Sequence, residues 1–188
     1  MVDQHKVEEA VRLLLEGIGE DPSREGLLET PARVARMYAE QLVAGMEEDG
    51  SEHLSKTFTV GSDDLVIERD ITFYSLCEHH MLPFYGKAAI GYIPDGRVAG
   101  LSKLARTVET FARRLQLQEQ LTAQVADALM EFLAPKGAIV LMEAEHMCMT
   151  MRGVQKPGTK TVTLARRGVF EADPALEQRF FNMLDRAR

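Results

Sequence analysis

The segment YGKAAIGYI, residues 85–93, predicts the β-strand around which the rest of the chain is arranged. A typical turn sequence, Pro94-Asp95-Gly96, follows it. Before this strand, we expect extended structure between 58 and 73 with a turn or bulge at 61–63. After it, we expect two helices, at about 102–113 and 118–133, followed by two strands at 138–144 and 160–165. This order of strand pair, helix pair and strand pair predicts an α+β fold with a four-stranded antiparallel sheet.

A helical arm, residues 1–52, is predicted ahead of a body formed by residues 53–188. Apolar residues at spacings of three and four predict a helix over 2–18. Thr30-Pro31 opens a second helix to about residue 45, because threonine caps helices and proline is tolerated at the first helical position. We expect a loop at 47–55 and a C-terminal helix from Asp173-Pro174 to about 186.

The charge is concentrated in the arm. The 188 residues carry a net charge of −7, and residues 1–52 hold 13 acidic and 5 basic residues. Nucleic acid is therefore not an expected partner, although local basic clusters leave room for a small anionic ligand. The sequence shows no apolar run of the ~20 residues that a membrane helix needs. Because the first ten residues also lack an apolar signal core, we expect a cytoplasmic protein without a membrane partner.

A four-stranded antiparallel sheet has two open edges, which proteins cover or pair. No covering element is obvious in the sequence. Edge-to-edge pairing of several copies into a closed ring is therefore our hypothesis for the assembly.

Two short segments hold both cysteines and three of the five histidines. They are SLCEHH, residues 75–80, and EHMC, residues 145–148. Cys77, His80 and Cys148 form a Cys2His set, which matches the three protein ligands of a catalytic zinc site. His79 and His146 would then remain as general acids or bases beside the ion. A structural Cys2His2 site that includes His79 or His146, or two buried thiols without metal, are the alternatives.

Basic residues form a second group, most of which are individually expected on solvated surfaces. Ser102 begins a predicted helix and serves either as its cap or in an anion site at that helix end. In Gln118-Glu119, a buried carboxylate could accept two hydrogen bonds from an amino-pyrimidinone edge. The spacing alone equally fits an acid at a helix N-terminus. The basic candidates are Lys103, Arg106, Arg152, Arg33 and Arg36.

Several segments together resemble the GTP cyclohydrolase I family. They are REGLLETPARVARMY, SLCEHHMLPFYGKAAIGYIP, GLSKLAR, QLQEQLT and EHMCMTMRG, and the resemblance extends from about residue 6 to residue 187. It implies a tunnelling fold, in which two helices lie between the second and third strands and the subunit sheets form a barrel. It further implies a homodecamer that has its active sites at subunit interfaces.

The reaction implied by this resemblance converts GTP and water to formate and 7,8-dihydroneopterin triphosphate, the first step of folate and pterin biosynthesis. One Zn2+ per subunit would be held by Cys77, His80 and Cys148. His146 would protonate guanine N7, His79 would shuttle a proton during formate release, and Ser102 would assist the ribose rearrangement. The substrate ligands implied are Glu119 with Gln118 at the guanine edge, Lys103, Arg106 and Arg152 at the triphosphate, and Arg33 and Arg36 from a neighbouring subunit.

Three other functions compete with this one. A zinc nucleoside deaminase also uses a His/Cys/Cys set, but its H-x-E and P-C-x-x-C patterns do not occur here. An oligomeric scaffold with a structural zinc would use four protein ligands. A pterin-binding relative of the same fold that has lost or changed its activity is disfavoured because every proposed catalytic position is filled.

Overall fold

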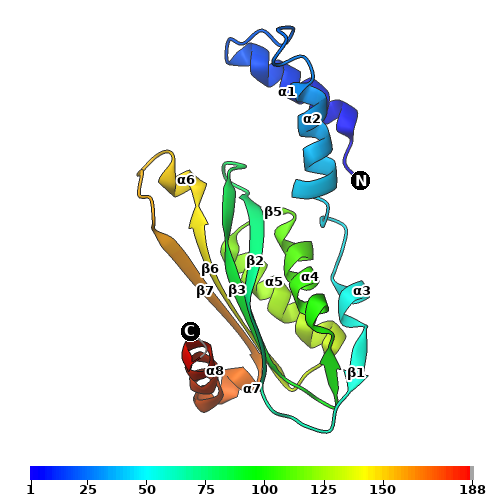
Figure 1. The fold of residues 1–188 in the computed structure, drawn as a ribbon, viewed down its shortest axis with the longest axis vertical. Coiled ribbons are helices and arrows are strands. Elements are labelled where there is room, and N and C mark those ends of the chain that lie inside the picture. Colours follow the sequence, from blue (N-terminus) through cyan, green and yellow to red (C-terminus); the bar gives the residue numbers. More distant parts are fainter. Residues whose placement is uncertain (187–188) are drawn as a thin grey trace.

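A curled sheet of five strands forms the body of the molecule (Figure 1). The structure is a computed structural model and describes residues 1–186. The strand order is β5-β2-β3-β6-β7. The four long strands pair antiparallel, which confirms the predicted strand pair, helix pair and strand pair. Their bounds are β2 Val66–Cys77, β3 Pro83–Ile93, β6 Gly137–His146 and β7 Lys160–Gly168.

The fifth strand makes the sheet mixed, and this corrects the prediction of four antiparallel strands. β5, Leu115–Gln116, lies between the two central helices and pairs parallel with Leu76 and Cys77 of β2. Two residues are too few to show a strand periodicity in the sequence. A separate antiparallel pair, β1 (Thr57–Thr59) with β4 (Arg97–Ala99), was also not predicted as a sheet of its own.

Two helices cover one face of the sheet and bury most of the core. They are α4 (Leu101–Ala112) and α5 (Gln118–Ala128), which continues as a π-helical turn, η2 (Leu129–Leu133). Phe84, Ile90 and Tyr92 of β3 are fully buried in this core together with residues of both helices. Each such side chain contributes about 1.5–3 kcal/mol by leaving water, so this packing holds the sheet and the helices in fixed register.

The opposite face is covered at one end by the C-terminal segment. Short helix α7 (Val169–Ala172) leads into α8 (Pro174–Arg186), and Phe170 and Phe180 pack there against Ile139. No helix among residues 1–186 is long and apolar enough to cross a membrane.

The N-terminal helices stand apart from the body (Figure 1). The predicted helix over 2–18 is observed as α1 (Gln4–Gly17). The second predicted helix is α-helical only over α2 (Thr30–Met37) and continues as π-helical η1 (Tyr38–Leu42). The expected loop at 47–55 contains a short helix, α3 (Ser51–Leu54). The helix starts there because Gly50 turns the chain with a φ of 83° and the Asp49 carboxylate accepts a hydrogen bond from Ser51 N–H.

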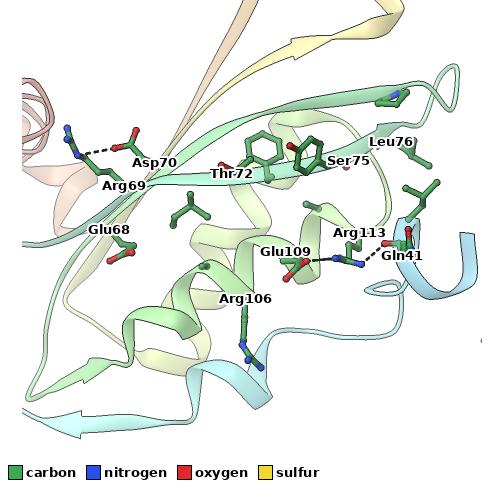
Figure 2. A pocket seen from close by; sticks show the side chains of 17 residues that line it. Gln41, Glu68, Arg69, Asp70, Thr72, Ser75, Leu76, Arg106, Glu109 and Arg113 are labelled. Carbon is green, nitrogen blue, oxygen red and sulfur yellow. Dashed lines mark hydrogen bonds and ion pairs between the residues drawn. The ribbon is translucent and has the colours of Figure 1, made fainter. Parts of the chain in front are cut away.

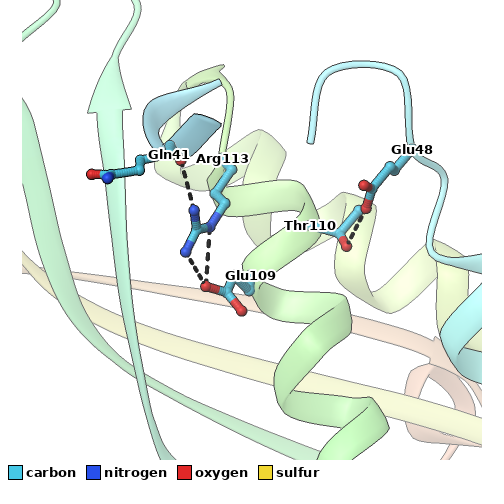
Figure 3. Close-up of polar contacts among 5 residues, drawn as sticks. All are labelled: Gln41, Glu48, Glu109, Thr110 and Arg113. Carbon is cyan, nitrogen blue, oxygen red and sulfur yellow. Dashed lines mark hydrogen bonds and ion pairs between the residues drawn. The ribbon is translucent and has the colours of Figure 1, made fainter. Parts of the chain in front are cut away.

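The last part of the arm, from Gln41 in η1 to Glu48, is tied to the C-terminal end of α4 (Figure 3). Arg113 donates to the carbonyl oxygen of Gln41 at 2.9 Å and pairs with Glu109, while Thr110 donates to Glu48 at 3.0 Å. Arg114 donates to the carbonyl oxygen of Gly45 at 2.9 Å. These contacts fix where the arm leaves the body.

Candidate metal centre and active site

Three possible metal ligands meet at one end of the sheet. Atoms of Cys77, His80 and Cys148 that could bind a metal all lie within 4.8 Å of one another. Cys77 ends β2, His80 lies in the turn to β3, and Cys148 lies in α6 (Met147–Thr150) directly after β6. Because Leu76 is opposite Pro83 and Phe84 is opposite His146, strand pairing brings the two segments together.

The turn that carries His80 is closed by its own backbone. The N–H of Cys77 donates to Leu82 O and the N–H of Met81 donates to Cys77 O, both at 2.8 Å. Met81 has a φ of 54°, in the left-handed region that reverses the chain sharply. The turn therefore presents Cys77 and His80 from a rigid loop.

The chemistry of this cluster fits zinc. Sulfur and imidazole nitrogen are the ligands that Zn2+ prefers, and the described residues bring three of them together. Burial raises the pKa of the Cys148 thiol, and the adjacent Cys77 raises it further. A divalent cation is the partner that stabilises both thiolates at once. The cluster is consistent with a zinc site of three protein ligands, with His79 and His146 outside it.

His146 is held from two directions. Its Nε2 lies 2.8 Å from Oε1 of Gln118, and its ring stacks parallel on Phe84 with the ring centroids 4.6 Å apart. Burial lowers the pKa of His146, and the nearby Glu119 carboxylate opposes this shift. His79 is exposed in the β2–β3 turn, beside the ring of His80.

Gln118 and Glu119 face different surroundings at the start of α5. The Gln118 side chain is 1% exposed, and its amide nitrogen lies within 3.1 Å of Met142 O, Thr161 O and Thr163 Oγ1. Glu119 is exposed in the first turn of the helix. Gln118 is thus turned into the protein, whereas the Glu119 carboxylate is available to a ligand.

Arg152 is the basic candidate that the fold places beside the metal cluster. Its exposed guanidinium donates to His80 Nε2 at 2.8 Å. Because guanidinium groups only donate, this imidazole nitrogen accepts. Arg152 therefore adds a positive charge at the edge of the cluster.

The other polar candidates lie elsewhere in the chain. Helix α4 starts after β4 and runs towards β5, and β5 pairs with Leu76 and Cys77. The first turn of α4 therefore lies at the end of the body away from the metal cluster (Figure 1). The twelve residues of α4 correspond to about 18 Å. Ser102 and Lys103 lie in this first turn, and Arg106 follows one turn later. Arg33 and Arg36 are exposed on α2, apart from the body.

A cavity of about 620 Å³ lies between β2 and α4 (Figure 2). Arg106 and Glu109 line it from α4, Arg113 lines it from the residue directly after α4, and Ser75 lines it from β2. The Ser75 hydroxyl is buried and has no hydrogen-bond partner among the residues that the structure describes. The cavity follows the side of β2 that no strand pairs with before Leu76.

Two contributors to the site were not predicted from the sequence. Phe84 supports the His146 ring, and the register that pairs these residues depends on contacts across the sheet. Arg113 lines the cavity beside β2 and donates to Gln41 O in the arm, whereas its sequence context is that of an ordinary surface arginine. The alternate apolar positions Phe84, Ala88, Ile90 and Tyr92 along β3 could have indicated the buried side of Phe84, but not its partner.

Known proteins match the chain over nearly its full length. The sequence profile of the family described as GTP cyclohydrolase I matches residues 7–185. The chain is 57% identical to the GTP cyclohydrolase 1 of Clostridium kluyveri over 97% of its length and 98% of that protein. It is 58% identical to the Clostridium perfringens enzyme over 98% and 99% of the two chains, and 57% identical to the Streptococcus pneumoniae enzyme over 97% and 99%.

A solved structure, the archaeosine synthase QueF-Like in its apo form, superposes with a TM-score of 0.48 and 19% identity, over 57% of this chain and 96% of that one. This likeness is too weak to assign the fold. The family is assigned by the near full-length sequence matches. The chain belongs to the GTP cyclohydrolase I family and converts GTP to dihydroneopterin triphosphate.

Proposed function

We propose that Cys77, His80 and Cys148 hold one zinc ion per subunit and that His79 and His146 move protons beside it. The observation that carries the proposal is the meeting of three donors within 4.8 Å while both other histidines stay outside the group. The chemistry that the ion supplies when bound is a water with a pKa of roughly 7, suited to hydrolysis near neutral pH. The remaining steps belong to side chains of this protein.

His146 donates a proton to guanine N7, which makes C8 electrophilic. Water adds at C8, and the C8–N9 bond breaks to leave a formamide. A second hydrolysis, with His79 as the proton shuttle, releases formate. Ser102 assists the rearrangement of the ribose before the new ring closes. General acid–base groups of this kind contribute typically 10²–10⁴-fold to a rate.

The substrate is held at both ends. Glu119 accepts hydrogen bonds from the guanine edge, with Gln118 directly behind it in the helix. The triphosphate is bound by Lys103, Arg106 and Arg152, and Arg33 and Arg36 reach it from a neighbouring subunit. Charge-assisted bonds of this kind are about twice as strong as neutral ones, which favours arginine at the phosphates.

The working unit of the proposal is a homodecamer with active sites at subunit interfaces. Within one chain, Ser102, Lys103 and Arg106 lie at or towards the opposite end of α4 from the metal cluster, so a second copy has to supply them. The free sides of β2 and β7 support edge-to-edge pairing of copies, because each is a strand edge without a strand partner over most of its length in residues 1–186. Sedimentation as a monomer would contradict this assembly.

Replacement of His79 tests the assigned chemistry. In His79→Ala, GTP is expected to be consumed while the formamide intermediate accumulates, because ring opening no longer leads to formate release. Chromatography of the nucleotides and a formate assay measure both steps. His5→Ala, on the exposed face of α1, is the matched control and should behave as the parent. Formation of dihydroneopterin triphosphate at the parental rate by His79→Ala would show that the role belongs to another group.

Mixing two inactive variants tests the shared site. Cys148→Ser removes a metal ligand, and Arg106→Ala removes a phosphate ligand that we place on a neighbouring copy. Each variant alone should be inactive. In randomly mixed oligomers about one quarter of the sites would keep both groups, so activity should return. Absence of any recovery in verified mixed oligomers would place both groups in one chain.

A further inference from the structure

A chain of polar side chains behind His146 fixes the orientation of the Gln118 amide. Thr122 Oγ1 donates to Gln118 O at 2.7 Å, so the hydrogen between the Thr122 and Thr163 hydroxyls, 2.6 Å apart, comes from Thr163. Thr163 Oγ1 is then free to accept from the Gln118 amide nitrogen at 3.1 Å. The same nitrogen faces the carbonyl oxygens of Met142 at 3.1 Å and Thr161 at 3.0 Å.

The opposite amide orientation is excluded by these neighbours. It would place Oε1 of Gln118 against two carbonyl oxygens, which cannot donate, inside a site where the side chain is only 1% exposed. The oxygen of the amide must therefore face His146. Since that oxygen only accepts, the imidazole Nε2 at 2.8 Å must carry a hydrogen.

We infer that Gln118 is a positioning residue that holds His146 in the Nε2–H tautomer, so that Nδ1 is the atom that exchanges a proton with the substrate. Phe84, fully buried, stacks parallel on the ring and fixes its plane, and the Gln118 bond fixes its rotation within that plane. Nδ1 has no hydrogen-bond partner among the residues that the structure describes. The inference rests on the proposed catalytic role of His146 and gives Gln118 a function distinct from contact with guanine.

Nitrogen spectroscopy on the unaltered protein tests the tautomer without reference to activity. Zinc-loaded protein labelled with ¹⁵N-histidine is measured by magic-angle-spinning NMR at a pH above the histidine range, and the His146 signals are assigned by difference from His146→Asn. We expect a protonated Nε2 and an unprotonated Nδ1. A protonated Nδ1 with an unprotonated Nε2 would overturn the inference.

Kinetics with a matched pair of variants test the consequence. Gln118→Met keeps the length of the side chain but removes the acceptor, so Nε2–H would be left without a partner. We expect kcat to fall roughly 5- to 150-fold, the range for a buried donor that loses its acceptor, with the KM for GTP nearly unchanged. Gln120→Met is the matched control, because it makes the same replacement at an exposed position of the same helix, away from His146.

The outcomes separate this inference from the proposed function. A parental kcat in zinc-loaded Gln118→Met, or an equal loss in Gln120→Met, would overturn the positioning role. A parental rate in His146→Ala would instead refute the proposed role of His146, while the tautomer seen by NMR would stand. If Gln118→Met does not assemble, the NMR measurement on the parent still decides the tautomer.

Discussion

The contact between Gly45 and the end of α4 leaves no room for a side chain. A Cβ added at Gly45 would lie 2.0 Å from Thr110 O and 2.9 Å from its carbonyl carbon, below the 3.0 Å that real contacts keep. In Gly45→Ala the part of the arm around residue 45 must therefore move away from the helix. This movement would break the bond from Gly45 N–H to Arg113 O, now 3.1 Å, and the bond from Arg114 to Gly45 O, now 2.9 Å.

The expected cost follows from the two bonds. A neutral backbone bond contributes about 1 kcal/mol and a bond from a charged donor about 1.5–3 kcal/mol, so the local loss is about 2.5–4 kcal/mol. Amide hydrogen exchange in residues 43–48 should accelerate by roughly 60- to 700-fold, since each 1.4 kcal/mol is tenfold. If the loss extends to the whole fold, Tm should fall by roughly 5–16 °C for a chain of this size.

Hydrogen exchange followed by mass spectrometry measures the effect directly. Gly61→Ala is the control, because a Cβ there meets nothing within 4 Å. If residues 43–48 of Gly45→Ala exchanged at the parental rate and Tm were unchanged, the contacts between Gly45 and the end of α4 would not be what anchors the arm.

Three further predictions concern the core and the substrate. Tyr92→Phe removes the acceptor of the Ala99 N–H and should cost about 1–3 kcal/mol at pH 7 in urea unfolding. Burial raises the pKa of the Tyr92 hydroxyl, so the stability that Tyr92 contributes is complete below its unfolded pKa of about 10 and is lost as pH rises through its folded pKa. The difference in unfolding free energy between parent and Tyr92→Phe should therefore shrink over that alkaline range. Equal unfolding free energies at pH 7 would contradict this prediction. Glu119→Gln should lower kcat/KM for GTP roughly 10- to 150-fold, because it removes a charged hydrogen-bond acceptor from the guanine edge. The neighbouring Gln120→Ala should leave kcat/KM unchanged, and equal kinetics of the two variants would exclude a contact between Glu119 and guanine. Arg33→Ala should raise the KM for GTP about tenfold with little change in kcat. Arg12→Ala, on α1, is the control and should keep the parental KM. Unchanged steady-state kinetics of Arg33→Ala would exclude a contact between Arg33 and the phosphates.

The meeting of Cys77, His80 and Cys148 could be predicted from the sequence because the signal is local. Cys77 and His80 share one turn, and Cys148 follows a strand that ends beside that turn. The long strands and helices were equally accessible, since their periodicities extend over many residues. Near full-length relatives then identified the family.

The surroundings of Gln118 and the short strand β5 could not be predicted in the same way. The partners of the Gln118 amide are carbonyl groups of β6 and β7, 24 and 43 residues away, and backbone carbonyls carry no sequence signal. β5 exists because Cys77 and Leu76 offer it an edge, so its two residues take their conformation from tertiary pairing. The π-helical turns η1 and η2, at the ends of two predicted helices, could not be predicted either, because they leave the spacing of apolar residues almost unchanged.

The dependence of turnover on bound zinc tests the central claim most directly. The protein is stripped of metal with a chelator, the metal content is measured, and formation of dihydroneopterin triphosphate from GTP is followed by the fluorescence of its oxidised product. We predict that activity is lost with the metal and returns as zinc approaches one ion per subunit, and that Cys148→Ser recovers neither. Full turnover by metal-free protein, or by Cys148→Ser without bound zinc, would contradict the account.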